Sequence, residues 1–151
     1  MGMSVYQDNS FDELWQMDFG GYCEEALNEA AVIVEAKMKA NAKSTVMHPG
    51  ESEMVDSIKP STPKKARTGA YIVNVGPRGY SDTKKYRAKD GHGQATKRTY
   101  KVSNALKAIW KEYGIPSRGI PAQPFISATV SQTESQIYEI LQRKFEEKAK
   151  L

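Results

Sequence analysis

Residues 71–101 read YIVNVGPRGYSDTKKYRAKDGHGQATKRTYK, and this stretch decides much of the expected fold. The first five residues alternate and are rich in β-branched side chains, which predicts a strand. Gly76-Pro77 ends that strand, because proline donates no ladder hydrogen bond. Residues 78–101 hold almost no aliphatic side chain, and a structureless loop of that length is uncommon in a compact domain. Since Asp90-Gly91 is a hairpin-turn signal, we expect an extended basic hairpin or loop arm with its tip near Gly91–Gly93.

Helical periodicity lies on both sides of this arm. Residues 22–42 predict a helix with an apolar face of Leu27, Ala31, Val34 and Met38. A second apolar set, Val102, Leu106, Ile109 and Tyr113, predicts a helix up to Gly114, which ends it in a left-handed conformation. The proline-punctuated loop 115–124 follows. A final helix runs from about Phe125 or Ser131 to Lys148, with an apolar stripe of Val130, Ile137, Leu141 and Phe145.

Two units are expected along the 151 residues. Residues 1–21 form an N-terminal arm with aromatic anchors, which Gly20-Gly21 separates from the rest. Residues 22–151 form a single domain, and 78–101 protrude from it. No stretch reaches the roughly 20 apolar residues that span a bilayer, and the N-terminus lacks the basic start and apolar centre of a signal peptide. We therefore expect a protein made in the cytoplasm, with no membrane partner.

Charge is distributed unevenly. Residues 1–58 hold eleven acids and three lysines, whereas residues 59–107 hold thirteen bases and two acids. One interpretation is head-to-tail self-association, in which the basic arm meets an acidic surface on a neighbouring copy. Contact with nucleic-acid phosphates is another, and a solvated loop is the third. Composition alone does not choose between them.

No constellation of catalytic or metal-binding residues can be assembled. His48, His92 and Cys23 lie in three different segments without metal-ligand spacing. Neither a P-loop nor a dinucleotide-binding glycine pattern is present. The acidic residues are typical of a solvated helix face. We expect no catalytic residue, no metal and no cofactor; a small host enzyme or toxin is the weaker rival interpretation.

Three short stretches, in order, resemble one family. Pro49-Gly50-Glu51 through Ile58 resembles its TG-x-L-x-x-S-I element, and Tyr71–Pro77 resembles its v-x-V-G-P strand. Glu112-Tyr113-Gly114, with Pro121 to Ile126 after it, resembles its E-[FY]-G-T … P-A-x-P-F ending. The family is that of the neck or tail-completion proteins of tailed bacteriophages, typified by a lambdoid siphophage head–tail joining protein. Ile115 and Ser127-Ala128 depart from its pattern, and residues 78–101 exceed the short connector expected at that place.

The resemblance implies an α+β fold, a small antiparallel sheet flanked by a long N-terminal and a long C-terminal helix. It also implies closed homo-oligomeric rings, often six-fold, in the neck or tail of the virion, between the head connector and the tail tube. The expected partners are other copies of the chain, the neighbouring connector or head-completion and tail-tube proteins, and DNA in the channel by non-specific contact. A nucleic-acid-binding module that uses the basic, tyrosine-bearing arm is the alternative.

Candidate contact residues come from three places. The arm supplies bases, the Pro121–Phe125 loop and the helix before it supply aromatics and prolines, and the N-terminal arm supplies aromatics that would need a partner. For Trp110, Tyr113 and Phe125, a role in the core is favoured over one at an interface, because aromatic residues at helical spacing usually pack inside. The set is Lys84, Lys85, Arg87, Lys97, Arg98, Trp110, Tyr113, Pro121, Pro124, Phe125, Phe11, Trp15 and Phe19.

Overall fold

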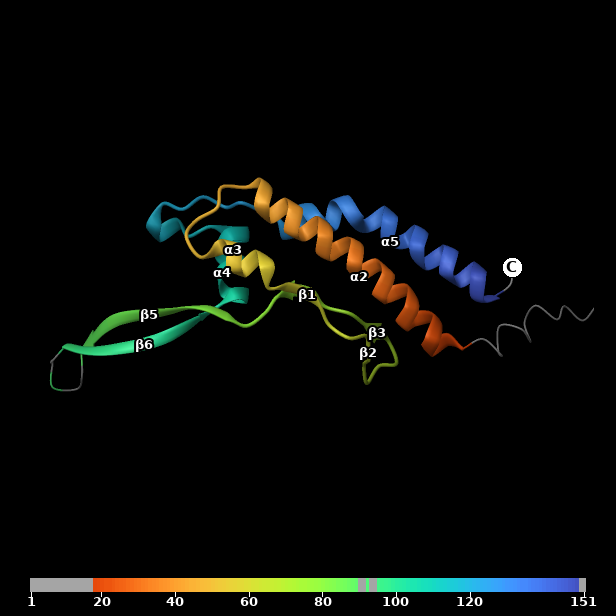
Figure 1. Cartoon of the computed structure of the whole chain (residues 1–151), viewed down its shortest axis with the longest axis horizontal. Coiled ribbons are helices and arrows are strands. Elements are labelled where there is room, and N and C mark those ends of the chain that lie inside the picture. The colour runs from red at the N-terminus through yellow and green to blue at the C-terminus, as the bar shows by residue number, and fades with distance from the viewer. Residues whose placement is uncertain (1–17, 90–91, 93–94, 150–151) are drawn as a thin grey trace, which may run out of the picture.

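The computed structural model describes residues 18–89, 92 and 95–149, and its element order is α, α, four short strands, a long hairpin, α, 3₁₀ and α. Two long helices lie side by side over two small sheets, and a third sheet, the long hairpin, projects from one end (Figure 1). The elements are α2 (Phe19–Ser44), α3 (Glu51–Asp56), β1 (Ile58–Pro60), β2 (Lys64–Lys65), β3 (Tyr71–Ile72), β4 (Val75–Pro77), β5 (Tyr80–Lys89), β6 (Ala95–Ser103), α4 (Asn104–Tyr113), η1 (Pro116–Arg118) and α5 (Ile126–Ala149). The predicted α+β class is confirmed.

Helix α2 begins three residues before the predicted start. The Asp18 carboxylate accepts a hydrogen bond of 3.0 Å from the Gly21 N–H and caps the helix. Gly20-Gly21 therefore does not separate an arm from the helix, because both glycines lie in its first turn. A Cβ on Gly21 would collide with the Asp18 carboxylate, so the glycine makes room for the cap. Residues 1–17, which make up most of the predicted N-terminal arm, lie outside the described residues.

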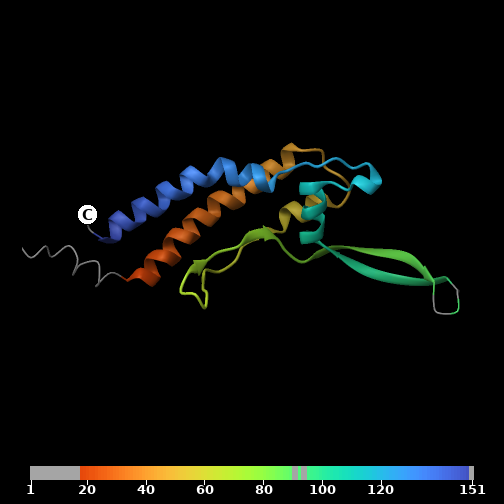
Figure 2. The same ribbon diagram turned by 180° about the vertical axis from the view of Figure 1, so that it is seen from behind.

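Helices α2 and α5 run antiparallel along most of their length (Figure 2). The residues that α2 buries along this alanine seam are small: Ala26, Ala30 and Ala31. Tyr22 Oη, near the start of α2, donates to Leu141 O at 3.1 Å, and Asn41 Nδ2, near its end, donates to Thr129 Oγ1 at 3.0 Å. These bonds fix the register of the pair at both ends.

The hydrophobic core cluster lies where α2 meets α3, β1 and α4. It contains Met38, Ala42, Met54, Val55, Ile58, Ala108 and Phe125. Phe125 is only 1% exposed and is the largest of the fully buried side chains. It is thus a core residue, as one of the two sequence interpretations proposed. Burial of so large an apolar side chain contributes about 2–3 kcal/mol to folding.

The predicted strand at 71–75 is wrong in its extent. The chain forms two short strands instead, and β3 pairs with β2 while β4 pairs with β1. Between them, Asn74 is held by Ser61, whose N–H donates to Asn74 O at 2.8 Å. Gly76 and Pro77 are the last two residues of β4, so the predicted end of the strand is confirmed. Proline is tolerated there because the sheet has only two strands and each keeps a free edge.

The two-stranded arm is confirmed. Strands β5 and β6 pair antiparallel from Tyr80 opposite Ser103 to Lys89 opposite Ala95. The predicted tip near Gly91–Gly93 lies outside the described residues except for His92. Ser103 ends β6 and caps α4 by accepting from Leu106 N at 3.1 Å. The arm is therefore fastened to the body through helix α4.

Candidate interaction surfaces

Helix α4 buries charged residues and exposes apolar ones. Its buried face contains Asn104, Lys107, Ala108, Lys111 and Glu112. On the other side, Ile109 is 52% exposed and Tyr113 is 73% exposed. The predicted apolar stripe thus identifies the helix correctly, but Ile109 and Tyr113 of that stripe do not pack in the core. The core interpretation is therefore wrong for Tyr113. The burial of charge is possible because each charged group finds partners in the fold.

Glu112, near the end of α4, caps the N-terminus of α5 from outside that helix. Its carboxylate accepts hydrogen bonds from Ile126 N at 2.8 Å, from Ser127 N at 3.0 Å and from the Ser127 hydroxyl. Burial alone would raise the pKa of Glu112, but these hydrogen bonds outweigh burial and leave the pKa below its usual value. A negative charge at this point also complements the positive end of the α5 dipole. The carboxylate thereby fixes the end of α4 against the start of α5.

Gly114 lets the chain reverse directly after α4. Its φ of 73° and ψ of −177° lie in a region that only glycine occupies readily. A Cβ here would lie 2.6 Å from Ile120 O and 2.7 Å from Ala122 N. The positive φ was predicted from the sequence, whereas this close approach of the backbone at 120–122 was not. The Glu-Tyr-Gly stretch and the proline loop are therefore parts of one structure that joins α4 to α5, called here the α4–α5 clamp.

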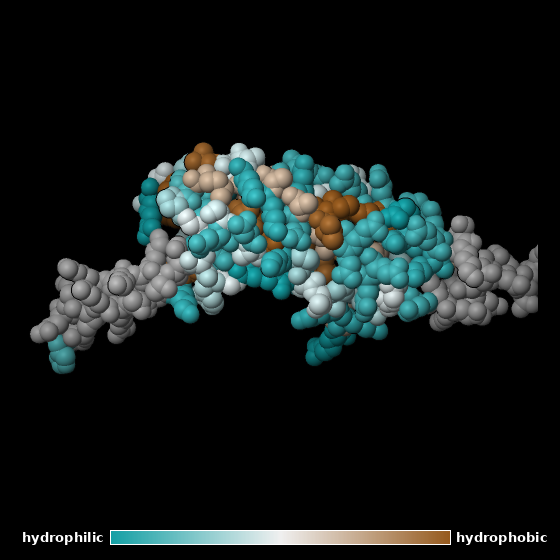
Figure 3. Space-filling model, in the orientation of Figure 1, coloured by the Kyte–Doolittle hydropathy of each residue, from teal (hydrophilic) through white to brown (hydrophobic). Residues whose placement is uncertain are grey.

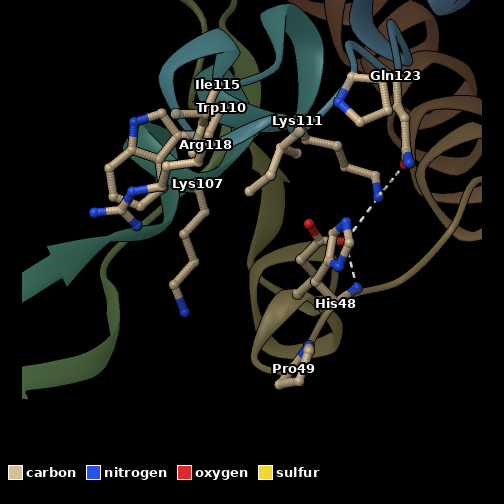
Figure 4. Close-up of a pocket in the computed structure, with 11 residues that line it drawn as sticks. His48, Pro49, Lys107, Trp110, Lys111, Ile115, Arg118 and Gln123 are labelled. Atoms are coloured by element: carbon tan, nitrogen blue, oxygen red, sulfur yellow. Dashed lines mark hydrogen bonds and ion pairs between the residues drawn. The ribbon is translucent and has the colours of Figure 1, made fainter.

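Lys111 holds together three segments around a cavity of about 160 Å³ (Figure 4). Its ammonium group donates to Glu51 Oε2 at 2.7 Å, to Val46 O at 2.9 Å and to Gln123 Oε1 at 3.2 Å. The Lys111 side chain is 1% exposed, so the ion pair with Glu51 is shielded from solvent. Every buried side-chain nitrogen or oxygen of the described residues has a hydrogen-bond partner. The polar groups around the cavity thus serve the fold.

Two candidate contact residues, Trp110 and Pro121, line this cavity together with His48, Pro49 and Arg118. Figure 4 shows Trp110 beside Arg118, on the far side of the cavity from Gln123. Neither His48 nor Arg118 was singled out as a contact residue from the sequence. Arg118 is exposed at the end of the 3₁₀ turn, which Gly119 closes in a left-handed conformation. The cavity is therefore apolar on its Trp110 side and cationic at its rim.

A second hollow, the α4–α5 groove, lies between α4 and the first turns of α5. Ile109 and Tyr113 from α4, and Ile126 and Val130 from α5, supply its apolar lining; Glu112, Ser127 and Ser131 complete it. Val130, assigned to the buried stripe of α5 from the sequence, is 59% exposed. Thr129, Thr133 and Ile140 are buried instead. Both threonine hydroxyls donate to the carbonyl four residues earlier, which allows them to lie in the seam.

The strand register divides the hairpin into two chemically different faces. Alternate residues of a strand fall on opposite faces of the sheet, and directly paired residues share a face. The tyrosine face consists of positions Asp82, Lys84, Tyr86, Ala88, Thr96, Arg98, Tyr100 and Val102. The cationic face consists of positions Thr83, Lys85, Arg87, Lys89, Ala95, Lys97, Thr99 and Lys101. Sequence reasoning found these bases but did not separate them by face.

The remaining candidates do not join these surfaces. Phe19 is exposed at the first turn of α2, and its ring lies 5.7 Å from that of Tyr22 and 6.4 Å from that of Tyr71. Pro124 is exposed in the loop before α5. Phe11 and Trp15 lie outside the described residues. The hairpin bases, the cavity with Trp110 and Pro121, and Phe19 thus lie in three separate regions (Figure 1).

Much of the acidic charge of α2 and α3 is paired within the chain. Glu25 pairs with Lys148 at 3.0 Å, Glu29 pairs with Arg143 and Lys144, and Glu35 pairs with Lys39 at 2.6 Å. Glu51 pairs with Lys111. The surface over these two helices is accordingly mixed, and mostly hydrophilic with a few apolar patches where α2 meets α5 (Figure 3). Within residues 18–58, the described part of the acidic third, the acids therefore do not form one acidic surface.

Within the described ranges, no group of three metal-ligating side chains comes together. Burial raises the pKa of the Cys23 thiol, so this half-buried cysteine is less reactive than an exposed one. No helix among the described residues is long and apolar enough to cross a bilayer.

Comparison with known proteins agrees with the resemblance seen in the sequence. Residues 8–89 match the family model HK97-gp10_like, whose description is "Bacteriophage HK97-gp10, putative tail-component". Searches among curated proteins and among solved structures found no match. The matched stretch includes α2, α3 and the short strands and ends with β5, so the α4–α5 clamp lies beyond it. Since the match spans more than half of the chain, this protein belongs to the HK97-gp10-like family of bacteriophage tail components.

Proposed function

We propose that this tail component is a non-enzymatic structural subunit of a ring at the head–tail interface, which joins or stabilises the connector and the tail tube. The observation that carries the proposal is the hairpin, which extends away from the body and leaves both of its long edges unpaired in the described chain (Figures 1 and 2). An isolated two-stranded hairpin is at best marginally stable in water. A partner molecule beside it would supply the missing contacts.

The partner that best fits the tyrosine face is the α4–α5 groove of a second copy. The groove offers apolar side chains, and tyrosines are favoured at such interfaces. From residue 119 to residue 142 the chain carries no base, and its acids there are Glu134 and Glu139, both exposed on α5. These acids complement Lys84 and Arg98 of the tyrosine face. Because hairpin and groove are different surfaces, the contact is heterologous and closes into a ring when the rotation between copies allows it.

Cross-linking in assembled particles tests this contact. With Cys23→Ser as background, the pair Tyr86→Cys and Val130→Cys should give dimers and higher ladders with a short bismaleimide. Lys85→Cys with Val130→Cys is the matched control, because position 85 neighbours position 86 but belongs to the cationic face. Equal cross-linking by both pairs, or none by either, contradicts the proposed contact.

The joining role has its own test. Electron microscopy of particles from cells with and without this chain should show separate heads and tails in its absence, and a ring of density at the neck in its presence. Joined particles that form without the chain would overturn the joining role, whatever the cross-links show.

A further inference from the structure

We infer that the cationic face of the hairpin is a sequence-independent binding site for the phosphate backbone of double-stranded DNA. Five of its eight positions are Lys or Arg, and none is acidic or aromatic. Affinity of this kind comes from phosphate neutralisation by Lys and Arg. A two-stranded ribbon also has suitable dimensions for the major groove of B-DNA. The inference adds a ligand to the proposed ring subunit.

The positive charges of the cationic face repel one another and destabilise the free hairpin. Arg87 lies directly opposite Lys97 in the register, with Lys85 and Lys89 two positions away along the same strand. Like charges in directly opposed positions destabilise a strand pair. A polyanion alongside this face would relieve the repulsion. The sequence of the hairpin thus favours binding to an anion over the stability of the free arm.

The base of the hairpin indicates which way the two faces lie. Val102, a position of the tyrosine face, is fully buried against the body. The neighbouring Lys101, a position of the cationic face, is exposed. At its root the hairpin therefore presents the cationic face to solvent, where a large ligand can reach it.

A second copy of the chain matches this face poorly. Glu25, Glu29, Glu35 and Glu51 already have cationic partners. Several exposed acids have no ion pair among the described residues, and they are divided among the start of α2, α2 itself, α3 and α5: Asp18, Glu24, Glu53, Asp56, Glu134, Glu139 and Glu146. Five clustered bases need a denser anion, and duplex DNA carries about one charge per 1.7 Å of its axis.

Binding of the purified full-length chain to a fluorescent random-sequence duplex, followed by anisotropy at several salt concentrations, tests the inference. We expect measurable binding at low salt, and an affinity that falls steeply with salt. The double variant Arg87→Gln/Lys97→Gln should lower the slope of log K against log salt by about two, roughly one for each lost phosphate contact. Its affinity near 0.1 M salt should fall about ten-fold.

The matched control is Lys84→Gln/Arg98→Gln, which removes the same charge from the tyrosine face. It should keep the wild-type slope, and circular dichroism should show both variants folded. Equal losses in the two variants would mean that net charge, and not the cationic face, binds DNA. No binding by the wild type at low salt, or tighter binding to poly-glutamate than to DNA of equal charge, would overturn the inference. The measurement needs no ring, so it can fail while the joining role stands.

Discussion

The Glu112 carboxylate accepts a hydrogen bond of 2.8 Å from the Ile126 N–H and thereby joins the end of α4 to the start of α5 across a proline-containing loop. Replacement of Glu112 by Gln removes the charge and turns one acceptor into a donor that faces other donors. We expect the free energy of unfolding to fall by about 2 kcal/mol. Urea denaturation measures the loss, and Glu134→Gln on the exposed side of α5 should change it little.

The same carboxylate makes stability depend on pH. Because the pKa of Glu112 is lower in the folded chain than the value of about 4.3 for a free side chain, its contribution is complete above that value. The contribution is lost as the pH falls through the lower folded pKa. The difference in unfolding free energy between wild type and Glu112→Gln should therefore shrink as the pH is lowered from about 6 towards about 3. A difference that stays constant over this range would contradict the assignment.

Gly114→Ala should be strongly destabilising. Alanine adopts this backbone conformation only with strain, and its Cβ would meet backbone atoms of Ile120 and Ala122 that cannot move aside cheaply. We expect a loss of about 3 kcal/mol or more in unfolding free energy. The matched control is Gly119→Ala, with φ of 66° but open space around a Cβ. It should cost only about 1 kcal/mol. Equal losses would contradict the role of the close approach.

Lys111→Met tests the buried ion pair. The substitution leaves Glu51 without its cation in a site that is 12% exposed, and we expect a loss of about 3–5 kcal/mol. The more exposed pair of Lys39 with Glu35 provides the comparison, since Lys39→Met should cost about 0.5 kcal/mol. In a double-mutant cycle, adding Glu51→Gln to Lys111→Met should restore part of the loss. Additive losses would mean that the two groups do not depend on each other.

The hairpin could be predicted from the sequence because the signals for it are local. A turn signal at Asp90-Gly91 lies within a stretch that has almost no aliphatic residues to bury, which predicts a hairpin. The pairing of Lys89 with Ala95 was not predicted from the sequence. The long helices were predicted for the same reason, as apolar periodicity extends over many turns. The ends of α2 were less certain, because Gly20-Gly21 has the composition of a break and becomes helical only through the Asp18 cap.

The orientation of α4 could not be read in this way. Periodicity shows that one face is apolar, but it does not show which face meets the core. The orientation of α4 depends on hydrogen-bond partners that are distant in sequence. Lys107 donates to Gly50 O and to the Ser81 hydroxyl, and Lys111 donates to Glu51. Glu112 accepts from the first turn of α5. Those partners lie up to 60 residues away, so the exposed Ile109 and Tyr113, and the α4–α5 groove with them, were hidden from the sequence.

The pairing of α2 with α5 has a consequence for synthesis. Tyr22 bonds to a carbonyl 119 residues later, whereas Glu112 bonds to groups only 14 and 15 residues away. The clamp is a short-range contact that closes quickly, but the alanine seam of α2 is among the first parts of the domain to leave the ribosome and is covered only after α5 has been made. Until then the nascent chain exposes a strip of small apolar side chains. Helix α2 is therefore the part of the nascent chain that most needs protection from premature association.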